Sequence, residues 1–219
     1  MRVAVLISGR GSNMENLIRA SYKPDSDIDI VLVISNYKNA PGLKIAQELG
    51  VETQIIEHGK FESRNAFELQ LTSVLENART EFICLAGFMR MLGTSFVNHW
   101  YNRLVNIHPS VLPAFKGLNT HQRVIEAGAH YSGCTVHFVR PNMDEGPIIL
   151  QAITPVRSED SAIELSNRVL KLEHECYPLA LNWIAKGQIS IVRGRVKLVE
   201  SDTHNITEPT DQSSKKGSK

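Results

Sequence analysis

The strongest constraint on the fold is the alternation of short, wholly apolar segments with helix-patterned segments through the first half of the chain. Residues 3–7 (Val-Ala-Val-Leu-Ile) form the first apolar run, and a glycine-containing turn at 8–13 separates it from apolar residues at helical spacing. Further apolar runs follow at 28–34, 51–56, 81–86 and 104–107. Strands that are apolar throughout must be covered on both faces. The alternation therefore predicts an α/β fold, with a Rossmann-like, mostly parallel sheet flanked by helices on both faces.

The pattern changes after Pro113. Apolar runs at 134–139 and 148–153 are joined by a short loop, which is typical of an antiparallel pair. Helical patterns cover 42–49, 61–75, 95–100, 121–126 and 161–186, and two short strands are expected around Arg193-Gly194. Residues 1–200 are interpreted as a single domain. Residues 201–219, which are almost entirely polar and lack periodicity, are interpreted as a disordered tail.

The charge balance restricts the kind of ligand. Lysine and arginine total 24 against 23 acidic residues, so the chain lacks the general basic field that drives nucleic-acid binding. The apolar runs are too short for a signal-peptide core or a membrane span, and a cytoplasmic protein is expected. The three cysteines lack metal-ligand spacing and are interpreted as reduced and structural. We therefore expect small-molecule substrates, without nucleic acid or membrane as partners.

The turn after the first apolar run is a candidate phosphate site. The backbone N–H groups of Gly11, Ser12 and Asn13 open the helix that follows, and a helix N-terminus favours an anion. A dinucleotide fingerprint is a second interpretation of such a turn, but Met14 occupies the place of its third glycine. A plain tight turn with Ser12 as helix cap stays open on this signal alone.

A second candidate site lies at the end of the run at 104–107, where Asn106 and His108 are two residues apart. Residues i and i+2 of a strand point to the same face, so both side chains can reach one reacting atom. Pro109 and Pro113 then stop the strand and stiffen its exit. An amide donor beside a titratable ring suits a developing oxyanion. The structural alternative is that Asn106 satisfies backbone groups and His108 is a packed histidine.

Three further segments carry groups whose purpose the local pattern leaves open. Asp144 lies in a proline-flanked loop at 141–147, and such a loop can hold a carboxylate against an imidazole and favour its protonated form. Residues 87–92 mix apolar side chains with one cation, and either line a slot for a flat aromatic ligand or belong to the core. Glu173-His174 is either a solvated pair or a contact to a phosphate-bearing substrate.

Together these segments resemble the phosphoribosylglycinamide formyltransferases, the folate-dependent enzymes of purine synthesis. The resemblance extends from residue 1 to about residue 195, and its specificity lies in the joint order and spacing of the motifs. The motifs are 7–13 (Ile-Ser-Gly-Arg-Gly-Ser-Asn), 86–90 (Ala-Gly-Phe-Met-Arg), 106–110 (Asn-Ile-His-Pro-Ser), 135–139 (Thr-Val-His-Phe-Val), Asp144 with Gly146-Pro147, and Glu173-His174 with Tyr177-Pro178.

The resemblance implies a reaction and a set of binding roles. The cosubstrate 10-formyltetrahydrofolate would give its formyl group to the amine of glycinamide ribonucleotide, and no metal is implied. Gly11, Ser12 and Asn13 would bind the substrate phosphate, and Glu173 would hold the ribose or glycinamide part. The implied folate-binding residues are Arg64, Met89, Arg90, Met91, Leu92, Asn106, Arg140 and Met143.

The resemblance also implies that Asn106, His108 and Asp144 are catalytic. Asn106 and protonated His108 would donate hydrogen bonds to the oxyanion, while Asp144 would orient His108 and assist proton transfer. A cis bond before Pro113 is implied as well. One departure stands close to this group, because Glu145 occupies a position where glycine is common in the family. A folate loop of different shape or charge is therefore expected.

Other classes of protein predict other features. A methionyl-tRNA formyltransferase would carry a further basic domain to grip tRNA, and a formyltetrahydrofolate deformylase would carry a regulatory domain before the first strand. Neither is expected here. A nonenzymatic nucleotide-binding module would use the glycine turn alone, and it gives no reason for Asn106, His108 and Asp144 to converge. A monomer and a homodimer are equally compatible with the sequence.

Overall fold

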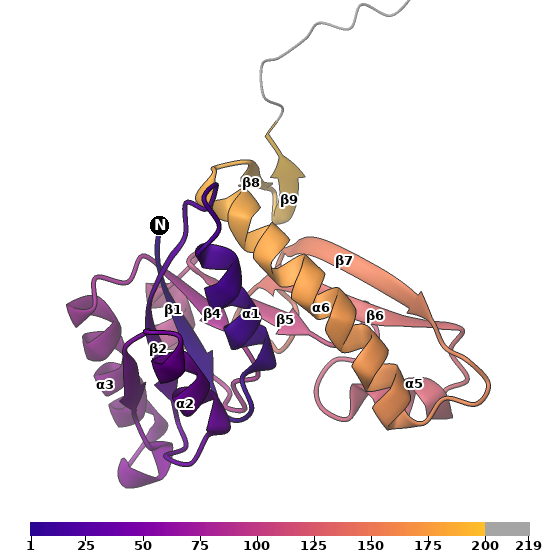
Figure 1. The fold of residues 1–219 in the computed structure, drawn as a ribbon, viewed down its shortest axis with the longest axis horizontal. Coiled ribbons are helices and arrows are strands. Elements are labelled where there is room, and N and C mark those ends of the chain that lie inside the picture. Colours follow the sequence, from indigo (N-terminus) through magenta and orange to yellow (C-terminus); the bar gives the residue numbers. More distant parts are fainter. Residues whose placement is uncertain (200–219) are drawn as a thin grey trace, which may run out of the picture.

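The computed structural model describes residues 1–199, which form a central sheet covered by helices (Figure 1). Its strands are β1 (Arg2–Ile7), β2 (Asp29–Ser35), β3 (Thr53–Ile55), β4 (Phe82–Leu85), β5 (Leu104–His108), β6 (Tyr131–Phe138) and β7 (Ile148–Pro155). They lie in the order β3-β2-β1-β4-β5-β6-β7. The first five are parallel, whereas the pairings β5–β6 and β6–β7 are antiparallel. The predicted fold class is confirmed, and the tail expected at 201–219 lies outside the described residues.

The helices lie in two layers. They are α1 (Ser12–Ser21), α2 (Pro41–Glu48), the 3-10 turn η1 (His58–Lys60), α3 (Arg64–Asn77), α4 (Thr94–His99), α5 (Thr120–Glu126) and α6 (Ala162–Ala185). The chain then forms the hairpin of β8 (Ile189–Val192) and β9 (Arg195–Leu198). Apolar residues of α1, α2 and α6 pack on one face of the large sheet, and those of α3 and α4 pack on the other. Strand β1 contributes to the cores on both faces because its side chains alternate, with Val3 and Val5 in the first core and Ala4 and Leu6 in the second.

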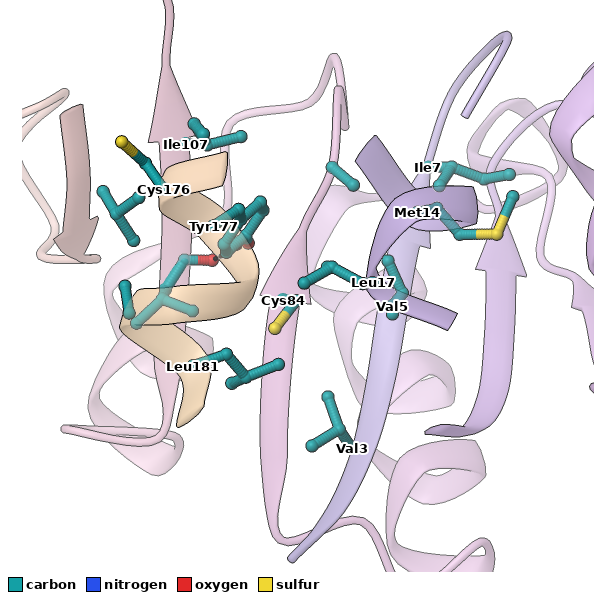
Figure 2. Close-up of a cluster of buried hydrophobic side chains, with 14 of the residues drawn as sticks. Val3, Val5, Ile7, Met14, Leu17, Cys84, Ile107, Cys176, Tyr177 and Leu181 are labelled. Atoms are coloured by element: carbon teal, nitrogen blue, oxygen red, sulfur yellow. Dashed lines mark hydrogen bonds between the residues drawn. The ribbon is translucent and has the colours of Figure 1, made fainter. Parts of the chain in front are cut away.

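Helix α6 is fixed to the sheet by a buried tyrosine. Tyr177 and Leu181 lie on the side of α6 that faces Cys84 of β4 (Figure 2). The fully buried Tyr177 donates its hydroxyl to the carbonyl oxygens of Leu85 at 3.0 Å and Val105 at 3.3 Å. These bonds join α6 to β4 and β5. They also hold the preceding turn of α6, which contains Glu173, in place above the sheet.

All three cysteines, Cys84, Cys134 and Cys176, are free and buried. Burial raises the pKa of the Cys84 thiol to about 12. The pKa values of Cys134 and Cys176 are also raised, mainly by burial. Thiols of this kind stay protonated at neutral pH, as expected of structural cysteines.

Element boundaries differ from the sequence prediction for local reasons. The strand expected at 51–56 is reduced to the three-residue edge strand β3. The third helix begins at Arg64, later than its apolar pattern, because the Ser63 side chain caps its first turn. α6 begins after Ser161, which forms a capping box with Glu164.

The strand order reverses beside β1, where β2 lies on one side and β4 on the other. In open α/β sheets, ligands bind outside the carboxyl ends of the strands at such a point. Two turns meet there: the amide of Ser8 donates to the carbonyl oxygen of Gly87 at 3.1 Å, and the amide of Met89 donates to Ser8 Oγ at 2.7 Å. The glycine turn and the 87–92 segment are therefore joined at the expected ligand crevice.

The pairing of β6 with β7 leaves no room for a side chain at Gly133. A Cβ there would lie 1.9 Å from the carbonyl oxygen of Ala152, and backbone atoms cannot give way as a flexible side chain would. We expect Gly133→Ala to lower the free energy of unfolding by about 1–3 kcal/mol, measured by urea denaturation. The control is Gly59→Ala, whose Cβ would meet nothing within 4 Å. Equal stability of the two variants would contradict the packing argument.

Candidate active site

Strands β5 and β6 present polar side chains on the same face at one end of the sheet. Asn106 and His108 lie at the end of β5, and antiparallel pairing sets His137 opposite Asn106 and Thr135 opposite His108. The strand stops at His108, and the chain then turns through a cis Leu112–Pro113 bond, as the resemblance implied. Two strands therefore deliver two imidazoles and one amide to the same place.

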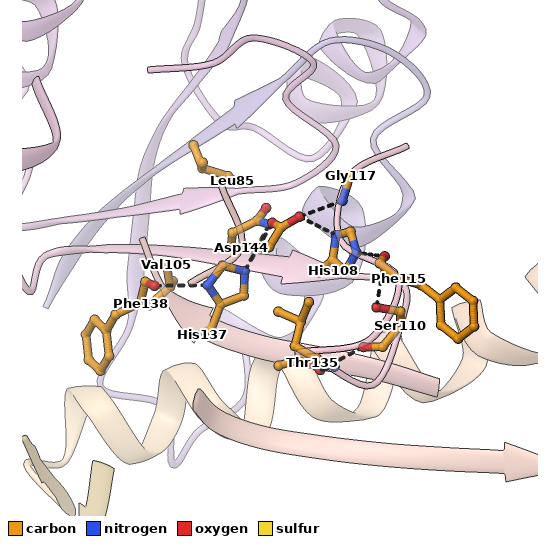
Figure 3. Close-up of polar contacts among 12 residues, drawn as sticks. Leu85, Val105, His108, Ser110, Phe115, Gly117, Thr135, His137, Phe138 and Asp144 are labelled. Atoms are coloured by element: carbon orange, nitrogen blue, oxygen red, sulfur yellow. Dashed lines mark hydrogen bonds and ion pairs between the residues drawn. The ribbon is translucent and has the colours of Figure 1, made fainter. Parts of the chain in front are cut away.

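Asp144 reaches this cluster from the connection between β6 and β7. Its Oδ2 lies 3.5 Å from Nδ1 of His108, and its Oδ1 lies 3.7 Å from Nε2 of His137 (Figure 3). The amide of Gly117 donates to Oδ2 at 2.9 Å. The Asp144 side chain is only 10% exposed, so its interactions with neighbouring charges are weakly screened. The structure thus brings Asp144 and His108 together and adds His137 to them.

The two ring nitrogens of His108 have different surroundings. Nε2–H donates to the carbonyl oxygen of Phe115 at 2.9 Å, so Nδ1 is the nitrogen that faces Asp144. The separation of 3.5 Å between Nδ1 and the carboxylate exceeds an ordinary N–H···O hydrogen bond. A protonated ring therefore keeps its Nδ1–H available to a second acceptor beside Asp144.

The turn behind His108 is braced by β6 and β7. The fully buried Thr135 donates its hydroxyl to the carbonyl oxygen of Ser110 at 2.7 Å. Gln151 Nε2 donates to Thr135 Oγ1 at 3.0 Å and to the carbonyl oxygen of Leu112 at 2.8 Å. These bonds hold the backbone that follows His108, and with it the acceptor for the imidazole.

His137 is a site residue to which the sequence interpretation gave no role. Burial lowers the pKa of His137, which keeps the ring uncharged near neutral pH. Its Nδ1–H donates to the carbonyl oxygen of Phe138 at 2.9 Å, so Nε2 can accept from the amide of Asn106 at 3.4 Å. This contact orients the NH₂ group of Asn106 and leaves one N–H to donate elsewhere. The available signal was the pair Thr135 and His137 at alternate positions of an apolar strand.

The turn after β1 has the geometry of an anion site. Gly11 is the N-cap of α1 with a φ of +75°, and a Cβ there would lie 3.1 Å from Cα of Gly42, so only glycine fits. No described side chain caps this helix, and Ser12 is its first residue. The interpretation of Ser12 as a helix cap is therefore wrong. The first-turn amides of α1 have no acceptor within the helix and can donate to an anion.

A buried carboxyl group from α6 closes the same turn. Asn13 Nδ2 donates to Glu173 Oε2 at 2.6 Å, and Glu173 is 8% exposed. Burial raises the pKa of Glu173, while the bond from Asn13 acts in the opposite direction. Glu173 therefore faces the glycine turn and is no solvated surface acid. It stands where a polar substrate group bound to the turn would reach it.

Comparison with known proteins identifies the family. The family model for "Formyl transferase" matches residues 1–181. Over 87% of its length the chain is 40% identical to the phosphoribosylglycinamide formyltransferase of Escherichia coli, of which it covers 90%. The chain belongs to the phosphoribosylglycinamide formyltransferase family. Members of the wider formyl transferase family use a folate-derived formyl donor.

Two further relatives define the extent of the likeness. The crystal structure of the phosphoribosylglycinamide formyltransferase from Anaplasma phagocytophilum is 42% identical, with a TM-score of 0.85, and the match covers 93% of this chain and 96% of that one. The trifunctional purine biosynthetic protein adenosine-3 of Gallus gallus is 47% identical over 87% of this chain. The chain spans only 19% of the length of that trifunctional relative.

In this chain, several residues expected at the folate lie together beyond β4. Residues 89–91 are exposed, whereas Leu92 is buried. Arg64, at the start of α3, is exposed and lies 3.9 Å from Glu68 Oε1. The buried Glu68 also accepts from the amide of Gly93 at 2.6 Å. The segment after β4 is therefore anchored to α3 and presents its polar backbone and two methionines outward.

The connection between β6 and β7 contributes the other expected folate residues. Met143 is 49% exposed. The guanidinium of Arg140 lies 4.0 Å from the centre of the Tyr101 ring and donates to Asn102 Oδ1 at 2.6 Å. Its side chain is thus held at the connection between α4 and β5.

Among residues 1–199, no group of three or more His, Cys, Asp or Glu side chains is arranged to hold a metal ion. None of the helices in this range combines the length and the apolar character that a bilayer crossing requires.

Proposed function

We propose that the protein transfers the formyl group of 10-formyltetrahydrofolate to the amine of N1-(5-phosphoribosyl)glycinamide, giving the N-formyl product and tetrahydrofolate, in de novo purine biosynthesis. The observation that carries the proposal is the Asp144 carboxylate 3.5 Å from His108, at the strand end that also bears Asn106. The ligands are small molecules, without metal, nucleic acid or membrane. The enzyme acts in the cytoplasm as a monomer or a homodimer.

The reaction requires donors for an oxyanion. Attack of the substrate amine forms a bond to the formyl carbon and places negative charge on the formyl oxygen. The N–H of Asn106 that does not serve His137, together with Nδ1–H of His108, donates to that oxygen. Both donors are fixed before the substrate arrives, Asn106 by His137 and His108 by Phe115. Removing one donor of this kind typically costs about 10²–10³ in turnover.

The reaction also requires a proton acceptor. The attacking nitrogen loses its proton through a water molecule to Asp144, the bond between the formyl carbon and the folate nitrogen breaks, and that nitrogen takes up a proton. Asp144 is held for this task by the amide of Gly117. Its carboxylate also orients the imidazole of His108, whose Nδ1 lies 3.5 Å away.

The two substrates occupy different parts of the crevice. The phosphate of the ribonucleotide receives hydrogen bonds from the amides of Gly11, Ser12 and Asn13, and Glu173 accepts from its ribose or glycinamide part. The folate lies between the 89–92 segment and the 140–144 backbone. This arrangement places the formyl carbon between the amine and the donors of β5.

The test is a formyl-transfer assay with 10-formyltetrahydrofolate, run with and without the ribonucleotide. We expect tetrahydrofolate and the N-formyl product to form only when both substrates are present. Hydrolysis of the folate without the ribonucleotide would identify a deformylase. Ribonucleotide binding without either reaction would favour a nonenzymatic nucleotide-binding module.

The buried carboxyl of Glu173 gives a prediction about pH. Because burial raises its pKa, the folded protein holds this proton more tightly than the unfolded chain, and stability falls as pH rises from 4.5 through the raised value. Glu173→Gln keeps an acceptor for Asn13, and we expect it to be at least as stable as the wild type at neutral pH. Its advantage should shrink toward about pH 4, measured by urea denaturation.

The same variant should bind the ribonucleotide about tenfold more weakly, because a neutral acceptor replaces a charged one. Calorimetric titration measures this loss. Glu175→Gln, at an exposed position of the same helix, is the control. A Glu173→Gln protein that is less stable than the wild type at neutral pH would contradict the burial argument.

A further inference from the structure

Glu145, the residue that departs from the family pattern, makes a contact between two loops. Lys116 Nζ lies 2.7 Å from Glu145 Oε1, and Asn142 Nδ2 donates to Glu145 Oε2 at 2.9 Å. Lys116 belongs to the connection between β5 and α5, whereas Asn142 and Glu145 belong to the connection between β6 and β7. The ion pair therefore joins segments that come from different strands of the sheet.

The base of the β6–β7 connection is fixed without this pair. The amide of Phe138 donates to the carbonyl oxygen of Pro147 at 2.9 Å. A Cβ at Gly146 would lie 1.5 Å from the carbonyl oxygen of Phe138, so the backbones are in close contact there. The tip before Gly146 is different, because residues 141–143 and Glu145 are exposed to solvent. The position of the tip thus depends on a few contacts to the opposite loop.

Two of those contacts involve neighbouring residues. The amide of Gly117 donates to Asp144 Oδ2. Lys116, which precedes Gly117, forms the ion pair with Glu145, which follows Asp144. Asp144 itself has a φ of 54°, in the left-handed region that L residues adopt rarely. A contact that holds Glu145 in place therefore also restrains the backbone that aims Asp144 at His108.

We propose that Glu145 is a positioning residue, and that its ion pair with Lys116 holds the β6–β7 loop in the arrangement where Asp144 faces His108. This inference rests on the proposed function, because it assigns the loop to folate binding and Asp144 to catalysis. In the absence of the pair the loop samples open arrangements. Folate then binds only the closed fraction, and its apparent affinity falls in proportion.

The pair is partly exposed, with side chains that are 33% and 46% accessible, so its contribution is modest and sensitive to salt. We expect Glu145→Gln to raise the KM for 10-formyltetrahydrofolate about two- to fivefold at low ionic strength, with a smaller effect on kcat. About 0.5 M salt should raise the wild-type KM toward that of the variant. A role in overall stability alone would not produce this salt-dependent difference.

The experiment compares the wild type with Glu145→Gln, the charge-swapped double variant Lys116→Glu/Glu145→Lys, and Glu48→Gln. The swap should restore the wild-type KM, because it rebuilds the ion pair with opposite polarity. Glu48→Gln is the matched control, since it removes a surface pair with Lys44 at 3.6 Å within α2, and its KM should not change.

Hydrogen–deuterium exchange of residues 140–147, measured without substrates, gives a second readout. Exchange in this segment should be faster in Glu145→Gln and return to the wild-type rate in the swapped variant. Unchanged KM and unchanged exchange in Glu145→Gln would overturn the inference. If the wild type transfers no formyl group, the proposed function fails, and the exchange measurement still decides whether Glu145 holds the loop.

Discussion

His108→Ala is expected to lower kcat for formyl transfer by at least about 10²–10³-fold, the usual cost of losing one oxyanion donor. Nδ1 of His108 faces Asp144 at 3.5 Å, and its N–H is the donor we propose for the formyl oxygen as that oxygen becomes negative. Binding of the ribonucleotide should change little, because the first-turn amides of α1 and Glu173 belong to other elements. Steady-state kinetics gives kcat and KM, and calorimetry gives the Kd of the ribonucleotide.

The control for this variant is His99→Ala, which removes an exposed imidazole paired with Glu76 at 2.9 Å. The loss of His108 also removes the shorter of the two hydrogen bonds to the carbonyl oxygen of Phe115, which keeps a bond from Ser110 Oγ at 3.3 Å, so a decrease in stability of about 0.5–1.5 kcal/mol is expected. Activity must therefore be compared on protein that circular dichroism shows to be folded. Substantial turnover by folded His108→Ala would mean that another group supplies the charge.

The sheet was predictable because its central strands are apolar on both faces. The run at 3–7 corresponds to β1, whose residues alternate between two cores, and the run at 104–107 corresponds to β5. The period of two also placed Asn106 and His108 on one face of β5. The strand predicted at 51–56 was too long, because only Thr53–Ile55 pairs with β2 at the edge of the sheet. Edge pairing is a tertiary property that local hydrophobicity does not encode.

The site was less predictable where it depends on contacts between distant segments. His137 lies beside Asn106 because of the antiparallel register of β5 and β6, which no local pattern fixes. The Arg140 side chain turns to Tyr101 because stacking and a hydrogen bond are available there. The pair of Lys116 with Glu145 depends on how two loops meet. In each case the residue type was visible in the sequence, but its partner was not.

Asp144→Asn is expected to lower kcat by about 10²–10⁴-fold, the range that a positioned acid or base contributes. Asparagine tolerates the left-handed backbone of this position, where φ is 54°, and its Oδ1 can still accept from the amide of Gly117. The loop should therefore keep its arrangement, and the KM for folate should change little. What the variant removes is the negative charge beside His108 and the acceptor for the proton of the amine. Asp25→Asn, at an exposed turn, is the matched control.

The double variant His108→Ala/Asp144→Asn tests whether the two residues act as one unit. If Asp144 works largely by charging and orienting His108, its carboxylate has little left to do once the imidazole is gone. The double variant should then lose scarcely more turnover than the more damaged single variant, measured under single-turnover conditions with both substrates saturating. Two losses that multiply fully would mean that Asp144 acts independently, as a proton acceptor alone. The separation of 3.5 Å between Nδ1 and the carboxylate favours the coupled outcome, because the effects of mutating two residues in direct contact are rarely additive.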